Sequence, residues 1–193
     1  MDNLDILLGT LLGDSSLQTY TGGKTWRLRY ISQNEEYIFH LYEVWRPYVS
    51  TGPRLSDDGY GNFRWYFNTR VIPELTQFVE ETQIYKRIGH KWIKKVPINW
   101  SNFSNALSER ALAYWYMDDG SKKNNAQAYY LCTDCFNLEE VKFLGSVFKE
   151  KWGIHVSYHK SRTNYRIYIP VGGSGKFKAM TEKYILQSFK YKL

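Results

Sequence analysis

Two apolar runs of the sequence end in aspartate. The first, "LLGTLLGD", ends at Asp14, and the second, "LAYWYMDD", ends at Asp118 and Asp119. Both runs predict buried helices, yet the helix dipole disfavours a carboxylate at a C-terminal end. Two carboxylates at close range also raise each other's pKa unless a cation lies between them. A hard divalent ion with oxygen ligands, such as Mg²⁺, suits such a pair.

Glycines in the first run indicate how the two acids could meet. Gly9 and Gly13 are four residues apart, so they lie on one face of the predicted helix and allow close approach of another backbone. If the two helices pack along a pseudo-twofold axis, Asp14 and Asp119 emerge at the same place. The alternative is that each acid is an ordinary solvated residue at a helix end, which a single run would favour.

The order of predicted elements repeats along the chain. Residues 5–85 and 108–190 both read helix, two strands, helix, two strands, helix. We therefore predict an α+β fold of two αββαββα half-domains with pseudo-twofold symmetry, at residues 1–88 and 108–193. A basic segment at 89–107 connects them. Because the duplication lies inside one chain, we expect a monomer.

Basic residues alternate with aromatic and amide side chains in the predicted strands. The 193-residue chain carries a net charge of +7, and its pI is about 9.2. In "NFRWYFNTR" (62–70), period-two alternation puts Phe63, Trp65 and Phe67 on one face, opposite arginine, tyrosine and asparagine. A solvated sheet face is the ordinary explanation for one such strand. Repetition in several strands of a basic chain favours nucleic-acid binding.

Composition and termini exclude several other classes of protein. A hydrophobic content of 43% excludes a disordered chain. Mean hydropathy is -0.52, and no apolar stretch approaches the roughly 18 residues of a membrane span. The start "MDNLDILLGT" is acidic where a secretory signal needs basic residues, and it does not resemble a transit peptide. We expect an intracellular protein, made inside the organelle if it works in a mitochondrion or chloroplast.

Cys132 and Cys135 form the motif "CTDC". A zinc site would need two more ligands at suitable spacing, and the four histidines provide no partner motif. We interpret the pair as two thiols in a reducing compartment.

The two acid-terminated runs resemble the signature of the LAGLIDADG homing endonucleases. The first copy spans Leu7–Ser15 and the second Leu112–Gly120. The eighth signature position, which binds metal in that family, falls on Asp14 and Asp119. Gly13 and Asp118 are further candidate metal ligands, although Asp118 is better explained as lying beside the ligand or facing DNA. The sequences of both motifs resemble those of the single-chain branch of the family, which includes the yeast mitochondrial omega-intron endonuclease.

The resemblance also implies two catalytic lysines. In that branch one lysine precedes a "TIP"-like turn between the halves, and another lies in a "YKLP"-like segment at the end of the second half. The matching stretches here are "IKKVPINW", which gives Lys94 with Lys95 as the alternative, and "FKYKL", which gives Lys192. The second motif departs from the family pattern at Tyr114 and Asp118, where small residues are usual, so close helix contact is less assured there.

The function implied is Mg²⁺-dependent, staggered cleavage of both strands of double-stranded DNA. Mn²⁺ or Ca²⁺ is expected to substitute for Mg²⁺ in binding. Two four-stranded sheets would form a saddle in the major groove over roughly 20 base pairs, about two helical turns. An RNA maturase that binds intron RNA, a catalytically inactive DNA-binding protein and a basic α+β protein without a nucleic-acid partner are the alternatives. The paired acids argue against a maturase that only binds RNA, although a dual role stays open, and an inactive DNA-binding protein would leave them unexplained.

Alternation assigns a set of side chains to the DNA. A shift of one residue in any strand would exchange its two faces, and Ile31 already breaks the alternation of its strand. The assigned residues are Gln18, Arg27, Arg29, Arg64, Tyr66, Asn68, Arg70, Gln127, Tyr129, His155, His159 and Arg166, with Lys122, Lys123 and Arg162 in loops.

Overall fold

The computed structural model describes residues 3–57, 59–124 and 126–193. Contacts divide the chain into two compact units. The first holds residues 14–81 together with Asn3, and the second holds Leu4–Gly13 and Thr82–Leu193. The N-terminal helix therefore packs in the second unit, and each unit is described by itself.

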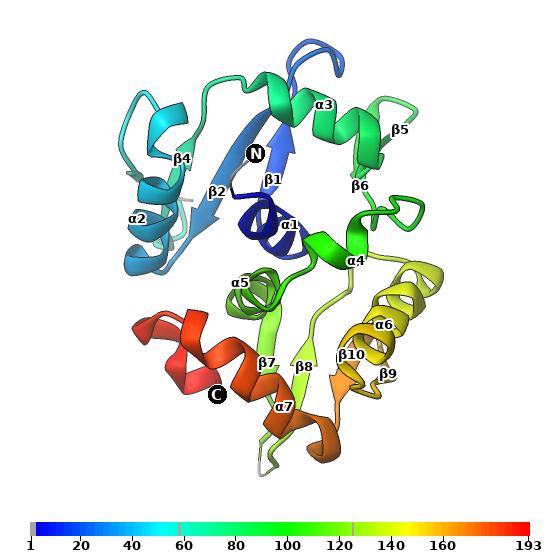
Figure 1. The fold of residues 1–193 in the computed structure, drawn as a ribbon. Helices are drawn as coiled ribbons and strands as arrows, with labels where there is room; N and C mark the ends of the chain where they lie inside the picture. The colour runs from blue at the N-terminus through cyan, green and yellow to red at the C-terminus, as the bar shows by residue number, and fades with distance from the viewer. Residues whose placement is uncertain (1–2, 58, 125) are drawn as a thin grey trace. The chain divides into compact units, whose positions relative to one another are not determined.

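The first unit is built on one antiparallel sheet with the strand order β1-β2-β4-β3 (Figure 1). Helix α2 packs on β2 and β4, and it begins where the Asn34 side chain accepts a hydrogen bond from the Tyr37 amide. Tyr30 and Phe67 from neighbouring strands are buried with ring centroids 5.2 Å apart. The elements are β1 Ser16–Gln18, β2 Arg27–Ser32, α2 Glu35–Val44, η1 Arg46–Tyr48, β3 Arg54–Asp57, β4 Phe63–Asn68 and α3 Pro73–Thr82.

The second unit contains a sheet of the same relative strand order, β7-β8-β10-β9. This agreement in topology is what the repeat in the sequence predicts. Helix α6 packs on β9 and β10, and α7 packs against α5. The elements are α1 Leu4–Leu12, β5 Tyr85–Ile88, β6 Lys91–Lys94, α4 Phe103–Ala106, α5 Glu109–Asp119, β7 Gly120–Lys122, β8 Tyr129–Leu131, α6 Leu138–Trp152, β9 Ser157–Ser161, β10 Asn164–Ile169, α7 Val171–Thr181, η2 Glu182–Tyr184 and η3 Gln187–Lys192.

Helices α1 and α5 pack side by side in the core of the second unit (Figure 1). Gly9 makes this possible, because a Cβ there would lie 2.9 Å from the carbonyl carbon of Ala111 and closer still to its oxygen. The N-terminal ends are joined by a two-pronged ion pair, in which Arg110 Nε and Nη2 lie 2.7 and 2.8 Å from the Asp5 carboxylate. Burial opposes ionisation of Asp5, but hydrogen bonds from Arg110 and Ser108 outweigh it and lower its pKa.

The predicted α+β class and the two antiparallel sheets are confirmed. The β5–β6 hairpin was not predicted: β5 ends the expected first half-domain, and β6 lies in the segment expected to be only a basic connection. Within the described residues, no helix is long and apolar enough to cross a membrane.

Candidate active site and nucleic-acid interface

The aspartates lie where α1 and α5 end. Helix α1 stops at Leu12, and the Gly13 amide still donates to the carbonyls of Gly9 and Thr10. Asp14 follows and is exposed, whereas Asp118 and Asp119 close α5 and are half-buried. Both acids thus occupy helix C-terminal ends, as the sequence indicates.

The end of α1 contacts the last turn of α5 through Gly13 and Asp118. A Cβ on Gly13 would lie 2.6 Å from Asp118 Oδ2, so only glycine leaves room for this carboxylate. Asp118 is therefore directed at the residue that immediately precedes Asp14 in the chain. The additional acid of the second motif, Asp118, does not prevent close packing of the two helices at this end.

Each predicted lysine binds main-chain carbonyls beside one of the two aspartates. Lys94 Nζ donates to the carbonyl of Gly13 at 2.7 Å. Lys192 Nζ donates to the carbonyls of Met117 at 2.6 Å and of Asp118 at 3.4 Å. Gly13 precedes Asp14 and Asp118 precedes Asp119, so the two lysines occupy equivalent positions.

This geometry favours Lys94 over Lys95, the alternative left open by the sequence. Lys95 Nζ instead lies 3.8 Å from the buried Glu140 carboxylate. A carbonyl oxygen has two lone pairs, so the bond from Lys94 leaves Gly13 one acceptor site. Its role as a metal ligand stays a prediction.

The donor set fits a hard divalent cation. The acids at the helix ends offer carboxylate oxygens, which are hard ligands. Cys132 and Cys135 form no disulfide, and Cys135 is exposed. Among the described residues, no group of three or more His, Cys, Asp or Glu side chains is arranged to hold a metal ion. Mg²⁺ tolerates this, because it is usually bound by one or two carboxylates and completes its shell with water and substrate phosphates.

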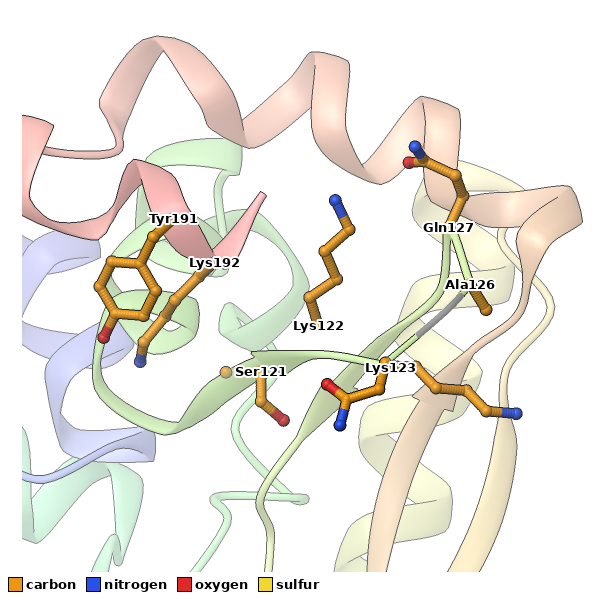
Figure 2. A pocket seen from close by; sticks show the side chains of 9 residues that line it. Ser121, Lys122, Lys123, Ala126, Gln127, Tyr191 and Lys192 are labelled. Carbon is orange, nitrogen blue, oxygen red and sulfur yellow. The ribbon is translucent and has the colours of Figure 1, made fainter.

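A basic pocket of about 810 Å³ adjoins the C-terminal end of α5, where Gly120 lines it. Figure 2 shows Tyr191 and Lys192 of the C-terminal segment on one side and Gln127 on the other, with the Lys122 side chain rising between them. Lys122 Nζ donates to the carbonyl of Leu193 at 2.8 Å. The expectation that Lys122 lies in a loop is wrong, because it is the last residue of β7.

The outer face of the first sheet gathers the predicted basic and amide side chains. Strand register pairs Gln18 with Arg27, and Arg29 with Asn68, so these residues share one face. Arg27 also donates to Gln18 Oε1 at 3.0 Å. The buried Leu28 and Tyr30 occupy the opposite face of β2, which is the phase that the alternation predicts, and the contact of Arg27 and Arg29 with DNA stays a prediction.

Strand β4 contributes Arg64 and Tyr66 to the same outer face. The guanidinium of Arg29 lies 5.3 Å from the centre of the Tyr66 ring. Arg54, which the sequence analysis missed, pairs with Tyr66 in register and is exposed. The alternation of "RLSD", with Leu55 in phase with Trp65, is the signal that could have found it. Arg70 lies beyond the strand, where its Nη2 donates to the carbonyl of Pro47 at 3.2 Å.

The assignment of Tyr129 to the DNA in the second sheet is wrong. Its side chain is fully buried, 5.1 Å from the Phe177 ring and 5.6 Å from the Tyr116 ring. Tyr130 takes the outer face instead, paired with Tyr168. The apolar Leu131, two residues after Tyr129, is the signal that fixes this phase.

His159 is the centre of an aromatic group on this outer face. Its ring stacks on Tyr168 with centroids 4.4 Å apart, and its Nδ1 lies 3.2 Å from the Tyr130 hydroxyl. Lys123 Nζ lies 5.4 Å from the centre of the Tyr168 ring. His155 is exposed just before β9.

The remaining predicted arginines of this sheet differ in their contacts. Arg162 is exposed in the turn between β9 and β10, with a positive φ of 56°. Arg166 is held by Asp134, whose Oδ2 lies 2.6 Å from Nη2. This hydrogen bond from Arg166 is the main reason why the pKa of Asp134 lies below its ordinary value.

Comparison with known proteins identifies the family. A model of the LAGLIDADG DNA endonuclease family matches residues 4–177. The chain belongs to this family. The resemblance seen in its two motifs, and with it the prediction of a DNA endonuclease, is confirmed.

Relatives of this LAGLIDADG chain cover nearly all of its length. It is 33% identical over 205 residues to DNA endonuclease I-ChuI of Chlamydomonas applanata, covering 98% of the chain and 93% of the relative. Probable intron-encoded endonuclease 1 of Wickerhamomyces canadensis is 29% identical, with 98% and 82% covered. Cytochrome b mRNA maturase bI2 of Saccharomyces cerevisiae is 28% identical over 100% of the chain but 47% of the maturase.

A solved structure gives the same fold. The homing endonuclease I-WcaI, bound to its DNA recognition sequence, superposes with a TM-score of 0.84 at 28% identity, covering 98% of this chain and 84% of that one.

Proposed function

We propose that the protein is a site-specific endonuclease that cuts both strands of a long DNA target with bound Mg²⁺. The observation that carries this proposal is the matched placement of two lysines. Lys94 binds the carbonyl that precedes Asp14, and Lys192 binds the carbonyl that precedes Asp119. A DNA-binding protein without nuclease activity would need neither the acids nor the lysines at these ends.

Asp14 and Asp119 are the proposed metal-binding residues, and Asp118 is directed at Gly13, the residue that precedes Asp14 in the chain. When bound, divalent ions lower the pKa of the attacking water and neutralise charge on the leaving oxygen. The two lysines supply positive charge near the reacting phosphates, where such groups stabilise the anionic transition state or orient the water. A duplex presents one scissile phosphate per strand, which explains why acid and lysine each occur twice.

The outer faces of the two sheets are the proposed DNA-reading surfaces. They carry guanidinium, amide, phenol and imidazole groups, which hydrogen-bond to base edges and phosphates in the major groove. A well-placed contact between arginine and guanine, or between an amide and adenine, gives about 1–3 kcal/mol of discrimination. We expect the target to span roughly 20 base pairs, about two helical turns, and the protein to act as a monomer encoded in an organelle.

The test is cleavage of a randomised duplex library in Mg²⁺, followed by sequencing of the ends. The wild-type protein should produce one staggered cut. Asp119→Asn should abolish this cut while leaving DNA affinity nearly unchanged, because the change removes a metal-binding charge but no base contact. Asp118→Asn is the matched control: if it alone abolishes cutting, the metal-binding acid has been assigned to the wrong residue.

RNA binding is the second candidate function, favoured by the match to a cytochrome b mRNA maturase over the whole chain. If the protein binds duplex DNA but cuts none of it in Mg²⁺ or Mn²⁺, intron RNA becomes the ligand to test. A group I intron transcript that the protein binds and helps to splice would then replace the nuclease proposal.

A further inference from the structure

A buried carboxylate, Glu140, contacts the segment that carries Lys94. Only 4% of Glu140 is exposed. One of its oxygens, Oε2, accepts from the Asn137 amide at 2.8 Å as part of the cap of α6, while the Asn137 side chain accepts from the Glu140 amide. The cap accounts for one oxygen only. The other, Oε1, accepts from the amide of Val96 at 3.0 Å.

The hydrogen bond to Val96 completes the anchoring of the backbone around Lys94. Lys94 itself pairs with Tyr85 in the β5–β6 hairpin, and the next amide, of Lys95, donates to the carbonyl of Ile84 at 2.8 Å. Glu140 then fixes the following peptide. A main chain held on both sides reduces the freedom of the side chain between them, which is the arrangement a reacting group requires.

A buried tyrosine on α5 contacts Lys192 in a corresponding way. Tyr116 is fully buried, and its hydroxyl donates to the carbonyl oxygen of Lys192 at 2.5 Å. Its ring is held in the core against Tyr129 and Phe177. Burial raises the pKa of Tyr116 far above its ordinary value, so the hydroxyl keeps its proton and remains a donor.

We propose that Glu140 and Tyr116 are positioning residues for the two lysines, each acting through the backbone that carries its lysine. The inference rests on the proposed function, in which Lys94 and Lys192 serve different scissile phosphates. It has a consequence that simple loss of stability would not produce. Removing one positioning group should slow cleavage of one strand and spare the other.

The experiment uses the full chain and the duplex target recovered from the library, with a different label on each strand. Glu140→Ala and Tyr116→Phe are compared in single-turnover cleavage at saturating protein, together with DNA affinity and thermal midpoint. Asn137→Ala removes the side-chain cap of α6 but keeps the contact between Glu140 and Val96. Tyr114→Phe makes the same chemical change as Tyr116→Phe at another buried position of α5.

We expect each positioning variant to slow one strand by about tenfold or more, and the two variants to slow opposite strands. DNA affinity and the rate on the other strand should stay close to the wild-type values. The two control variants should cut both strands normally. Glu140→Gln retains one acceptor oxygen, and it should recover part of the rate lost in Glu140→Ala.

Equal slowing of both strands, or the same slowing in Asn137→Ala, would overturn the inference by showing a purely structural role. Normal cleavage by both positioning variants, with Lys94→Met and Lys192→Met inactive, would overturn it and leave the proposed function intact. If the lysine variants themselves cut normally, the catalytic assignment of the lysines fails instead.

Discussion

Replacing Gly9 by alanine tests whether α1 and α5 are in direct backbone contact. The new Cβ would lie 2.9 Å from the carbonyl carbon and 3.0 Å from the Cα of Ala111. These atoms belong to the backbone of α5, so no side-chain rotation relieves the overlap and the helices must separate. Overpacking of this kind costs about 1–3 kcal/mol, occasionally more. An alanine in a helix interior otherwise gains about 1 kcal/mol over glycine.

Because the obstacle is backbone, we expect an overpacking cost of about 3 kcal/mol, which the helix-propensity gain reduces to a net loss of about 2 kcal/mol in the free energy of unfolding. At about 2–4 °C per kcal/mol for a chain of this size, the thermal midpoint should fall by about 4–8 °C. The matched control is Gly175→Ala in α7, where a Cβ meets no atom within 4 Å. That variant should gain about 1 kcal/mol from helix propensity alone and melt about 2–4 °C higher.

Thermal unfolding of the three proteins by circular dichroism measures both effects. A midpoint in Gly9→Ala at or above the wild-type value would refute the reasoning, since it would mean that the two helices are not in backbone contact. A fall in Gly175→Ala as large as that in Gly9→Ala would show that the loss at Gly9 does not come from α5.

Two further variants address charge. Asp5→Asn should lower the thermal midpoint at pH 7, because the folded protein holds the pKa of Asp5 below its ordinary value of 3.8. The stability that this carboxylate contributes is present above pH 3.8 and is lost as the pH falls through the folded pKa. The thermal midpoints of wild type and variant should therefore converge in acid. A constant difference at every pH would contradict this assignment. Arg64→Gln should weaken DNA binding, and if the arginine neutralises one phosphate it should reduce the slope of log affinity against log salt by about 0.9. The control is Arg46→Gln, which removes the same charge from a residue paired with Glu43. This variant should leave the slope unchanged.

Features set by local spacing were predictable from the sequence. The i, i+4 spacing of Gly9 and Gly13 indicated a close helix contact, and the structure packs α1 on α5 at Gly9. Alternation in β4 placed Arg64 and Tyr66 on the face opposite Phe67, and Phe67 is the buried residue of this strand. The order of elements in the two halves predicted two sheets, and their strand order is the same.

Features that depend on distant partners were not predictable in this way. The error at Tyr129 arose because tyrosine occurs on both faces of a sheet, and only packing against Phe177 of α7 decides its side. The roles of Glu140 and Tyr116 depend on hydrogen bonds to residues 44 and 76 positions away. No periodicity records such contacts, and in the sequence Glu140 is only the last residue of a capping box that begins at Asn137.

The position of the lysines explains why acids are tolerated at the ends of α1 and α5. The last carbonyls of a helix carry partial negative charge and repel a carboxylate. Lys94 and Lys192 place an ammonium group on the carbonyls of Gly13 and Asp118, which precede Asp14 and Asp119 in the chain, and so oppose that repulsion before any metal binds. In the proposed reaction the same cations would lie near the developing negative charge. Each lysine would then act on the folded protein as well as on the chemistry, and we expect its replacement by methionine to cost about 1 kcal/mol of stability besides the loss of cleavage.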